Sequence, residues 1–561
     1  MRYFLIFAFA ASLAAQEKLV ESIEVRVANV DVVVTDHSGK AVTGLTRNDF
    51  EVLENGKPQT ITNFYEITPK DASLPLTVSG GGQGTAPVQP GEASVLHGNV
   101  APPDDLRTRR FIFMIDNYSM EPAQRNVVLA AVRKFLDTNF KPGDEAALYL
   151  WLRKGQMITP LTNDKAELFR GIDSLASQSR TGMSVIEEEQ RTRRDCTEII
   201  NEIDNEHMNW DQAWLHCKGF IDAFAQSIWA NETTLLHDLK AVMSTLAGID
   251  GRKVIVLAGA SLPQHPGRES MMWAAQQFEP HLGHQLVTRA MSEGTAHSQT
   301  FAIADVAKFA NATGVTFYTI DAADQRNEAT ADVTLMPTDK LESFMSFTDS
   351  AAAYKALADI TGGSALTGTQ NFSLAFETLS RDLTSYYSLG YKPEGTSGER
   401  RIAVRVKKPG LVVHARQSYT PKSSDQDIND RVVANVYHHG AKGEWPIELT
   451  AQEPQKNNDR FLVPVTIQMQ PNVTLIPQAD KLEGGFTLYI VVGNKQGAMS
   501  KVTKTTRKIE IPSNAESQFR ENPMTFKLQL SVLPGDNIIS VGVADQISNA
   551  TGFDRVEVAA K

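Results

Sequence analysis

The stretch that decides the fold reads Arg110-Phe-Ile-Phe-Met-Ile-Asp116-Asn-Tyr-Ser119-Met120. Its apolar residues from Phe111 to Ile115 follow one another without alternation. This pattern is typical of a central parallel strand that helices cover on both faces. Open α/β sheets bind their ligands at the carboxyl ends of the strands. Asp116, which ends the predicted strand, is therefore placed where a metal ion or a partner would bind.

Length and composition describe an ordinary globular protein of several domains. The chain has 561 residues, of which 42% are hydrophobic and 22% charged. We expect roughly two to four domains from that length. The formal net charge is −11. Because there is no basic excess to neutralise phosphates, a nucleic-acid partner is not expected.

The N-terminus has the features of a secretory signal peptide over residues 1–15. One arginine precedes a short apolar core, and small residues lead to a polar start at Gln16. The apolar core is too short to span a bilayer, and no comparable run follows in the chain. We therefore expect an exported protein, secreted or periplasmic, without a transmembrane segment in the mature chain.

Cys196 and Cys217 are the only two cysteines. In an oxidising compartment, two cysteines in one local segment are candidates for a disulfide. The bond would close a loop worth about 3 kcal/mol on a chain-entropy estimate. The alternative is a pair of free buried thiols.

Residues 108–385 alternate strand and helix patterns, which predicts a doubly wound, mostly parallel sheet. A helix expected at Leu235–Leu246 precedes a strand at Lys253–Leu257, and a further strand runs from Val315 to Asp321. Two insertions interrupt this rhythm. Residues of about 183–230 favour extra helices, and residues of about 261–300 have a less regular pattern. Both follow strands, on the edge where this architecture keeps its binding loops.

β-modules are predicted on either side of the α/β domain. Residues 19–67 have strand patterns and an Asn55-Gly56 hairpin signal, and strands within 386–420 would complete this module. A Gly-rich and Pro-rich stretch at 71–105 predicts a flexible linker. The polar residues 422–433 predict a second linker. Residues 434–561 have the strand and turn pattern of an immunoglobulin-like β-sandwich.

The strand that ends at Asp116 resembles the first strand of a von Willebrand factor type A domain. The wider chain resembles the secreted VWFA-related proteins described chiefly from Acidobacteria, over about residues 20–420. The segments that carry this resemblance are Val33–Gly39, Gly44–Gly56, Gly251–Leu257, Gly314–Asp321, Leu357–Gly363, Tyr387–Pro393 and Arg416–Tyr419. The resemblance implies a type A domain combined with β-modules, export from the cell, and a binding role without established catalysis.

The resemblance also implies where a metal would bind. Type A domains hold Mg²⁺ through the motif Asp-x-Ser-x-Ser, together with a Thr and a further Asp from later loops. Asp116 matches the first position of the motif, but Tyr118 and Met120 stand at the two serine positions. Ser119 is one residue out of register.

The later loops offer little more. Thr181 is the candidate for the threonine, while the expected aspartate is absent from Leu257-Ala-Gly-Ala-Ser261. Two or three oxygens cannot readily replace the hydration shell of Mg²⁺, a hard cation that prefers octahedral oxygen coordination. The sequence therefore favours a structural Asp116 in a degenerate site, with Asp116, Ser119 and Thr181 as the ligands if a metal binds.

The sequence favours a non-enzymatic binding protein that contacts a protein or a cell-envelope ligand. It contains no Gly-x-Ser-x-Gly elbow, no His-Glu-x-x-His and no phosphate-binding Gly-x-x-x-x-Gly-Lys-[Ser/Thr]. One alternative is an exported hydrolase that acts on polysaccharide or peptide, with its site in the 261–300 insertion. Another is a purely structural envelope component.

Overall fold

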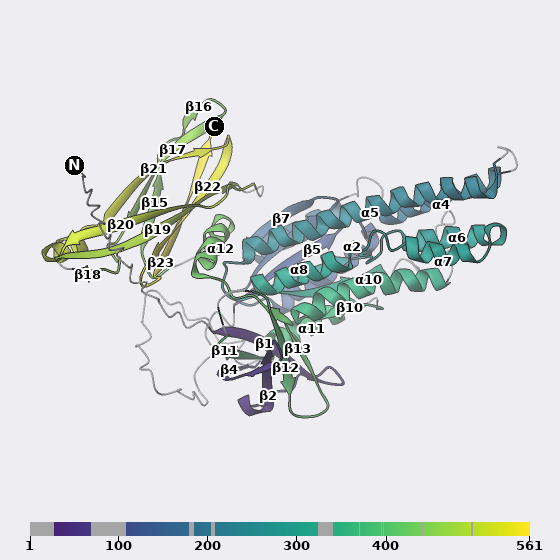
Figure 1. The fold of residues 1–561 in the computed structure, drawn as a ribbon, viewed down its shortest axis with the longest axis horizontal. Helices are drawn as coiled ribbons and strands as arrows, with labels where there is room; N and C mark the ends of the chain where they lie inside the picture. Colours follow the sequence, from purple (N-terminus) through teal and green to yellow (C-terminus); the bar gives the residue numbers. More distant parts are fainter. Residues whose placement is uncertain are drawn as a thin grey trace, which may run out of the picture.

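The computed structural model describes residues 27–68, 108–178, 184–203, 208–323, 340–369, 371–393, 395, 398–438, 443–478, 480–494 and 498–561. For residues 340–347 only the backbone is described. The predicted signal peptide, the predicted linker at 71–105 and Thr181 lie outside these ranges. Figure 1 shows a helix-rich domain on the right, one β-module below it and a second β-module, formed by the C-terminal part of the chain, on the left. No helix in the described ranges is long and apolar enough to cross a membrane.

A six-stranded, parallel-rich sheet forms the middle of the α/β domain, as the sequence predicts. Its order is β10-β9-β8-β5-β6-β7. The strands are β5 (Arg109–Asp116), β6 (Glu145–Trp151), β7 (Gly155–Thr162), β8 (Arg252–Gly259), β9 (Val315–Asp321) and β10 (Ala365–Leu366). β5 pairs in parallel with β6 and β8, so the strand that decides the fold is central. β7, which the sequence analysis did not predict, is an antiparallel edge strand.

Helices cover both faces of this sheet. One face carries α2 (Pro122–Asn139), α3 (Lys165–Ser177) and α11 (Ser373–Thr384), and the other carries α5 (Trp210–Leu246), α8 (Thr300–Thr313) and α10 (Lys340–Thr361). β5 supplies side chains to both layers, with Phe111 and Phe113 in the first core and Ile112 and Met114 in the second. Burial on both faces explains why the strand is apolar without alternation.

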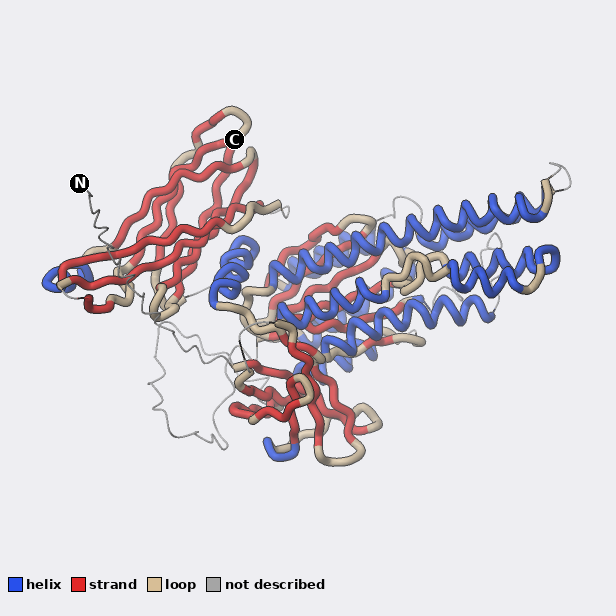
Figure 2. Tube along the Cα trace, viewed as in Figure 1, coloured by secondary structure: helices blue, strands red, loops and turns tan. Residues whose placement is uncertain are grey.

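The two insertions form a helical extension, which we define as α4 (Val185–Glu202), residues 210–230 of α5, α6 (Arg268–Leu282) and α7 (Gln285–Glu293). Figures 1 and 2 show it projecting from the sheet domain, away from the β-modules. A disulfide between Cys196 and Cys217 joins α4 to α5. The bond lies in an apolar core that includes Trp214 and Phe278.

Two expectations for this region need correction. The helix expected at Leu235–Leu246 is the last third of the 37-residue α5, which begins after the cap residue Asn209. The 261–300 insertion is largely helical instead of irregular. Gly267 and Gly283, both at positive φ, flank α6, and Pro280 lies inside it. These helix-breaking residues obscure the helical spacing in the sequence.

The N-terminal β-module combines strands from both sides of the α/β domain. One sheet has the order β13-β1-β11-β4 and the other β14-β12-β2-β3. The strands are β1 (Ala28–Asp36), β2 (Phe50–Glu54), β3 (Lys57–Gln59), β4 (Ile61–Ile67), β11 (Tyr386–Tyr391), β12 (Arg400–Val406), β13 (Leu411–Ala415) and β14 (Ser418–Tyr419). Val30 faces Leu389 across the β1–β11 pair, and the two sheets share one apolar core. Asn55 and Gly56, both at positive φ, turn the chain between β2 and β3.

The C-terminal β-module is also built from two antiparallel sheets around one core. Its strands are β15 (Ile447–Ala451), β16 (Gln455–Asn457), β17 (Arg460–Met469) and β21 (Met524–Val532) in one sheet, and β18 (Ile476–Gln478), β19 (Lys481–Asn494), β20 (Thr503–Pro512), β22 (Gly535–Asp545) and β23 (Thr551–Ala560) in the other. A short helix, α13 (Glu516–Glu521), precedes β21. The immunoglobulin-like class of both modules stays a prediction.

The predicted linker at 422–433 was wrong, because this segment belongs to helix α12 (Ser424–Tyr437). The side chain of Ser423 caps it by accepting a hydrogen bond from the Gln426 N–H. Val432 packs against β22 so closely that a Cβ at Gly542 would lie 2.4 Å from its methyl carbon. α12 also contacts α5, so it lies between the C-terminal β-module and the α/β domain.

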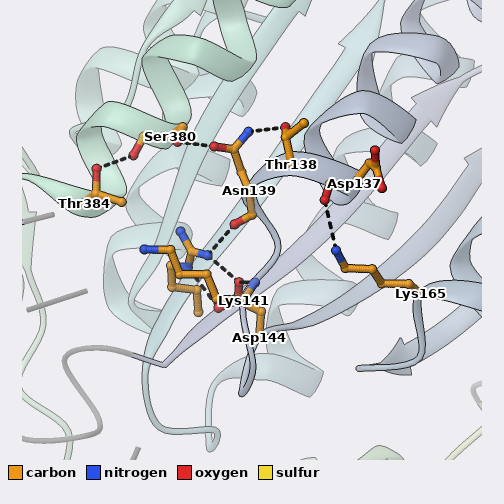
Figure 3. Close-up of polar contacts among 9 residues, drawn as sticks. Asp137, Thr138, Asn139, Lys141, Asp144, Lys165, Ser380 and Thr384 are labelled. Atoms are coloured by element: carbon orange, nitrogen blue, oxygen red, sulfur yellow. Dashed lines mark hydrogen bonds and ion pairs between the residues drawn. The ribbon is translucent and has the colours of Figure 1, made fainter. Parts of the chain in front are cut away.

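A polar network lies at the start of the central strand β5 (Figure 3). Arg109, at the start of β5, forms a buried ion pair with Asp144, and its guanidinium also donates to the Asn139 carbonyl. The Lys141 N–H donates to Asp144 at 2.7 Å, and Ser380 Oγ donates to Asn139 Oδ1 at 2.8 Å. The network ties β5, the α2–β6 loop and α11 together.

Candidate functional site

Asp116 ends β5 as predicted, but its own loop uses its carboxylate. Oδ1 accepts hydrogen bonds from the backbone N–H groups of Tyr118 at 2.9 Å and Ser119 at 3.1 Å. Oδ2 accepts from Ser119 Oγ at 2.6 Å. Ser119 Oγ in turn accepts from the N–H of Ala260, which follows β8. Ser119, out of register for the metal motif, thus links two strand-end loops.

The residues at the two serine positions are part of the core. Tyr118 is buried and meets the ring of Trp151 edge to face, with ring centroids 5.7 Å apart. Its hydroxyl donates to Glu188 of α4 at 3.2 Å and accepts from Asn231 of α5 at 3.2 Å. Met120 is fully buried among the helices of the first face. Met120 has no hydroxyl, and the Tyr118 hydroxyl is hydrogen-bonded to α4 and α5.

The end of β8 leaves little space for a side chain at Gly259. A Cβ at Gly259 would lie 2.4 Å from the hydroxyl of Tyr354 and 3.2 Å from Asp116 Oδ2. Asp321, at the end of β9, is also buried and accepts from the Ala323 N–H at 3.0 Å. No three His, Cys, Asp or Glu side chains of the described residues come together in a way that would hold a metal ion.

The described strand-end loops are closed over by helices. Asp116 is 2% exposed, and Leu262 and Ala322 in the neighbouring loops are also buried. The Asp349 carboxylate of α10 holds the loop that leads into α6. It accepts hydrogen bonds from the His265 backbone N–H at 2.8 Å and from the Arg268 guanidinium at 2.9 Å. Asp116 and the described loops beside it are therefore internal.

Glu232 of α5 is the residue that sequence analysis missed. It is 5% exposed, and its Oε2 has no hydrogen-bond partner among the described residues. Burial raises the pKa of the Glu232 carboxyl well above its usual range, and the charges of Asp116 and Asp349 raise it further. A signal was present, since Glu232 stands four residues after Ile228 and three before Leu235, on the apolar face of the helix.

Sequence reasoning therefore located part of this site. Asp116 and Ser119 come together, although as hydrogen-bond partners of one loop, while Thr181 lies outside the described residues. Cys196 and Cys217 lie in the helical extension, remote in sequence from the strand ends. The arrangement is a buried group of carboxyl side chains at the base of a helical cover, in which burial favours the protonated form of Glu232.

No protein-family model matches the chain, and no curated protein matches it either. Solved structures similar to it include a von Willebrand factor type A protein from Catenulispora acidiphila, at 7% identity over 81% of this chain and 66% of that one, with a TM-score of 0.26. The vWF domain of the type V pili tip protein Mfa5 from Porphyromonas gingivalis is 11% identical over 49% of this chain and 94% of that one, with a TM-score of 0.24. BatB from Bacteroides thetaiotaomicron is 10% identical over 49% and 97%, with a TM-score of 0.22. At these TM-scores the structural similarity does not support the fold assignment, which rests on the strand order alone.

Proposed function

We propose that this chain is an exported, non-enzymatic binding protein whose helical extension contacts a protein or a cell-envelope ligand. In this proposal the metal site of the type A fold has become a structural hydrogen-bond network. The partner then needs no carboxylate to complete a metal shell. The sequence resemblance to secreted VWFA-related proteins supports export and a binding role.

The observation that carries this proposal is the burial of Asp116 beneath the helices. A partner cannot reach a carboxylate that is 2% exposed and already accepts three hydrogen bonds. The insertions that cover it extend outward from the same edge of the sheet. Binding loops of α/β proteins usually occupy that edge, so the extension takes the place of those loops.

A binding experiment tests the role of the extension. The mature protein is immobilised, and fractions of cell-envelope extract are titrated over it with and without EDTA. We expect saturable retention that EDTA leaves unchanged. Leu215→Glu on α5 and Met291→Glu on α7 place charges at exposed apolar positions of the extension, and they should weaken binding at least about tenfold, a loss of roughly 1.4 kcal/mol.

Leu533→Glu is the matched control, because Leu533 is as exposed as Met291 but belongs to the C-terminal β-module. It should leave retention unchanged. Loss of retention in EDTA would contradict a metal-independent surface. Equal loss of retention in all three variants would show that the binding surface lies outside the extension. Absence of any saturable partner would favour a purely structural envelope component.

A further inference from the structure

A cavity lies at the junction between the N-terminal β-module and the α/β domain, far along the sheet from Asp116. Its volume is about 170 Å³. β1 and the segment after β13 line one side, and the starts of β8 and β9 line the other. Gly314 and Gly362, which follow the ends of α8 and α10, line it as well. Pockets between domains are common ligand sites because both domains can supply binding groups.

The lining of this cavity is cationic. Its charged residues are Arg252, Lys253, Arg416 and Asp31. Asp31, the one carboxylate among the lining residues, pairs with Arg252 at 3.2 Å. Arg252 also donates to the Asp382 carbonyl and lies over the ring of Tyr386. Lys253 and Arg416 therefore leave an uncompensated positive charge facing the cavity.

These two cations retain unused hydrogen-bond donors. Lys253 is 8% exposed, and its ammonium donates to the Ile249 carbonyl at 2.9 Å, its one acceptor among the described residues. Arg416 donates to the Asn29 carbonyl, while its buried Nε has no partner among the described residues. A buried donor without a partner is costly, and an ionised acceptor in the cavity would satisfy it.

Burial, together with nearby cations, lowers the pKa of the Lys253 ammonium to about 7. The charged groups acting on it are Lys422, Arg110 and Arg416, which lower the pKa, and Asp250, which raises it. A second cavity shares Asn29, Gly251 and Lys253 with the first and is lined by Asp427 and Arg431 of α12. Lys253 thus lines cavities bordered by the N-terminal β-module, the α/β domain and α12.

We propose that this junction cavity binds a small oxyanion carrying two negative charges, with Lys253 and Arg416 as its main contacts. The ligand class follows from the size of the cavity, its excess of positive charge and its unused N–H donors. Such an anion would bridge the N-terminal β-module and the α/β domain through one residue of each. The site is independent of the partner surface on the helical extension, so either proposal can fail without the other.

Thermal unfolding with inorganic sulfate and inorganic phosphate tests the proposal on the mature protein. We expect both anions to raise the unfolding midpoint saturably, in proportion to the logarithm of their excess over Kd. Sodium chloride at equal ionic strength should not reproduce the rise. A rise that chloride matches, or no saturable rise with either oxyanion, would overturn the proposal.

Lys253→Gln should weaken sulfate binding at least tenfold, whereas Lys456→Gln, at an exposed position of β16, should leave it unchanged. Circular dichroism and the midpoint without sulfate show whether each variant folds. Arg416→Gln serves as a second variant if Lys253→Gln does not fold. Unchanged sulfate affinity in a folded variant of either residue would contradict the assignment.

A measurement on the unmodified protein removes any dependence on variants. Sulfate stays doubly charged across neutral pH, so a bound proton must be taken up by the protein. Because a bound anion favours the charged form of Lys253, binding should take up a fraction of a proton at neutral pH, and affinity should fall as pH rises above about 7. Calorimetry in two buffers of different ionisation enthalpy measures this uptake. Binding without proton uptake would contradict the role of Lys253.

Discussion

Replacing Glu232 by Gln should stabilise the α/β domain, and by more at higher pH. The side chain is buried, and its pKa is raised by burial and then by Asp116 and Asp349. The folded state therefore keeps a proton that the unfolded chain releases above its ordinary pKa of 4.5. Since the folded state then binds more protons, the stability of the wild-type protein falls as pH rises. Gln has nearly the same shape and no such proton.

The size of the effect follows from proton linkage. Each pH unit in which Glu232 is protonated only in the folded state costs the wild-type protein about 1.4 kcal/mol. The advantage of Glu232→Gln should therefore grow steadily as pH rises above about 4.5. The amide adds a pH-independent offset of its own, because it also buries polar atoms. The test is therefore how the difference in unfolding free energy between Glu232→Gln and the wild type changes with pH, because its value at one pH includes this offset.

Urea unfolding followed by tryptophan fluorescence measures this difference. The signal reports mainly on the α/β domain and its extension, which contain every tryptophan except Trp445. Glu198→Gln, at an exposed position of α4, is the matched control and should give a flat difference. A flat difference for Glu232→Gln, or one that shrinks as pH rises, would refute the claim that a buried proton resides on this carboxyl.

Two further predictions concern the parts that flank the sheet. Cys196→Ala combined with Cys217→Ala should cost the helical extension about 3 kcal/mol, and faster hydrogen exchange in α4 would report it, whereas unchanged exchange would mean that the bond adds no stability. Val432→Asp puts an unpaired charge between α12 and β22, where Val432 is fully buried. It should weaken the docking of α12 by at least about 3 kcal/mol, and protease cleavage near residues 422–438 should increase. A variant as resistant as the wild type would contradict the packing of α12.

Much of the fold was predictable because its strongest signals are local. The apolar run from Phe111 to Ile115 gives a central strand directly, since both faces of that strand are buried. α12 was missed for the opposite reason. The buried apolar residues that face the β-module, Ile428, Val432 and Val436, recur at helical spacing within a segment whose first half is polar. Tertiary packing, and not composition, makes that segment a helix.

The candidate site was predictable only in its first residue. The strand pattern places Asp116, but Glu232 and Asp349 reach it from helices more than one hundred residues further along the chain. No local spacing joins such residues. The absence of the metal motif's serines was readable from Tyr118 and Met120. The hydrogen bond from Ser119 to Asp116 could be seen only in the structure of the loop.

The most direct test of the central claim, that Asp116 is a structural acceptor and no longer a metal ligand, is thermal unfolding in EDTA, Mg²⁺, Mn²⁺ and Ca²⁺ in turn. A metal that binds only the folded state must raise the unfolding midpoint as its concentration exceeds Kd. The structural account predicts the same midpoint in all four conditions. A saturable rise that Asp116→Asn abolishes would contradict it.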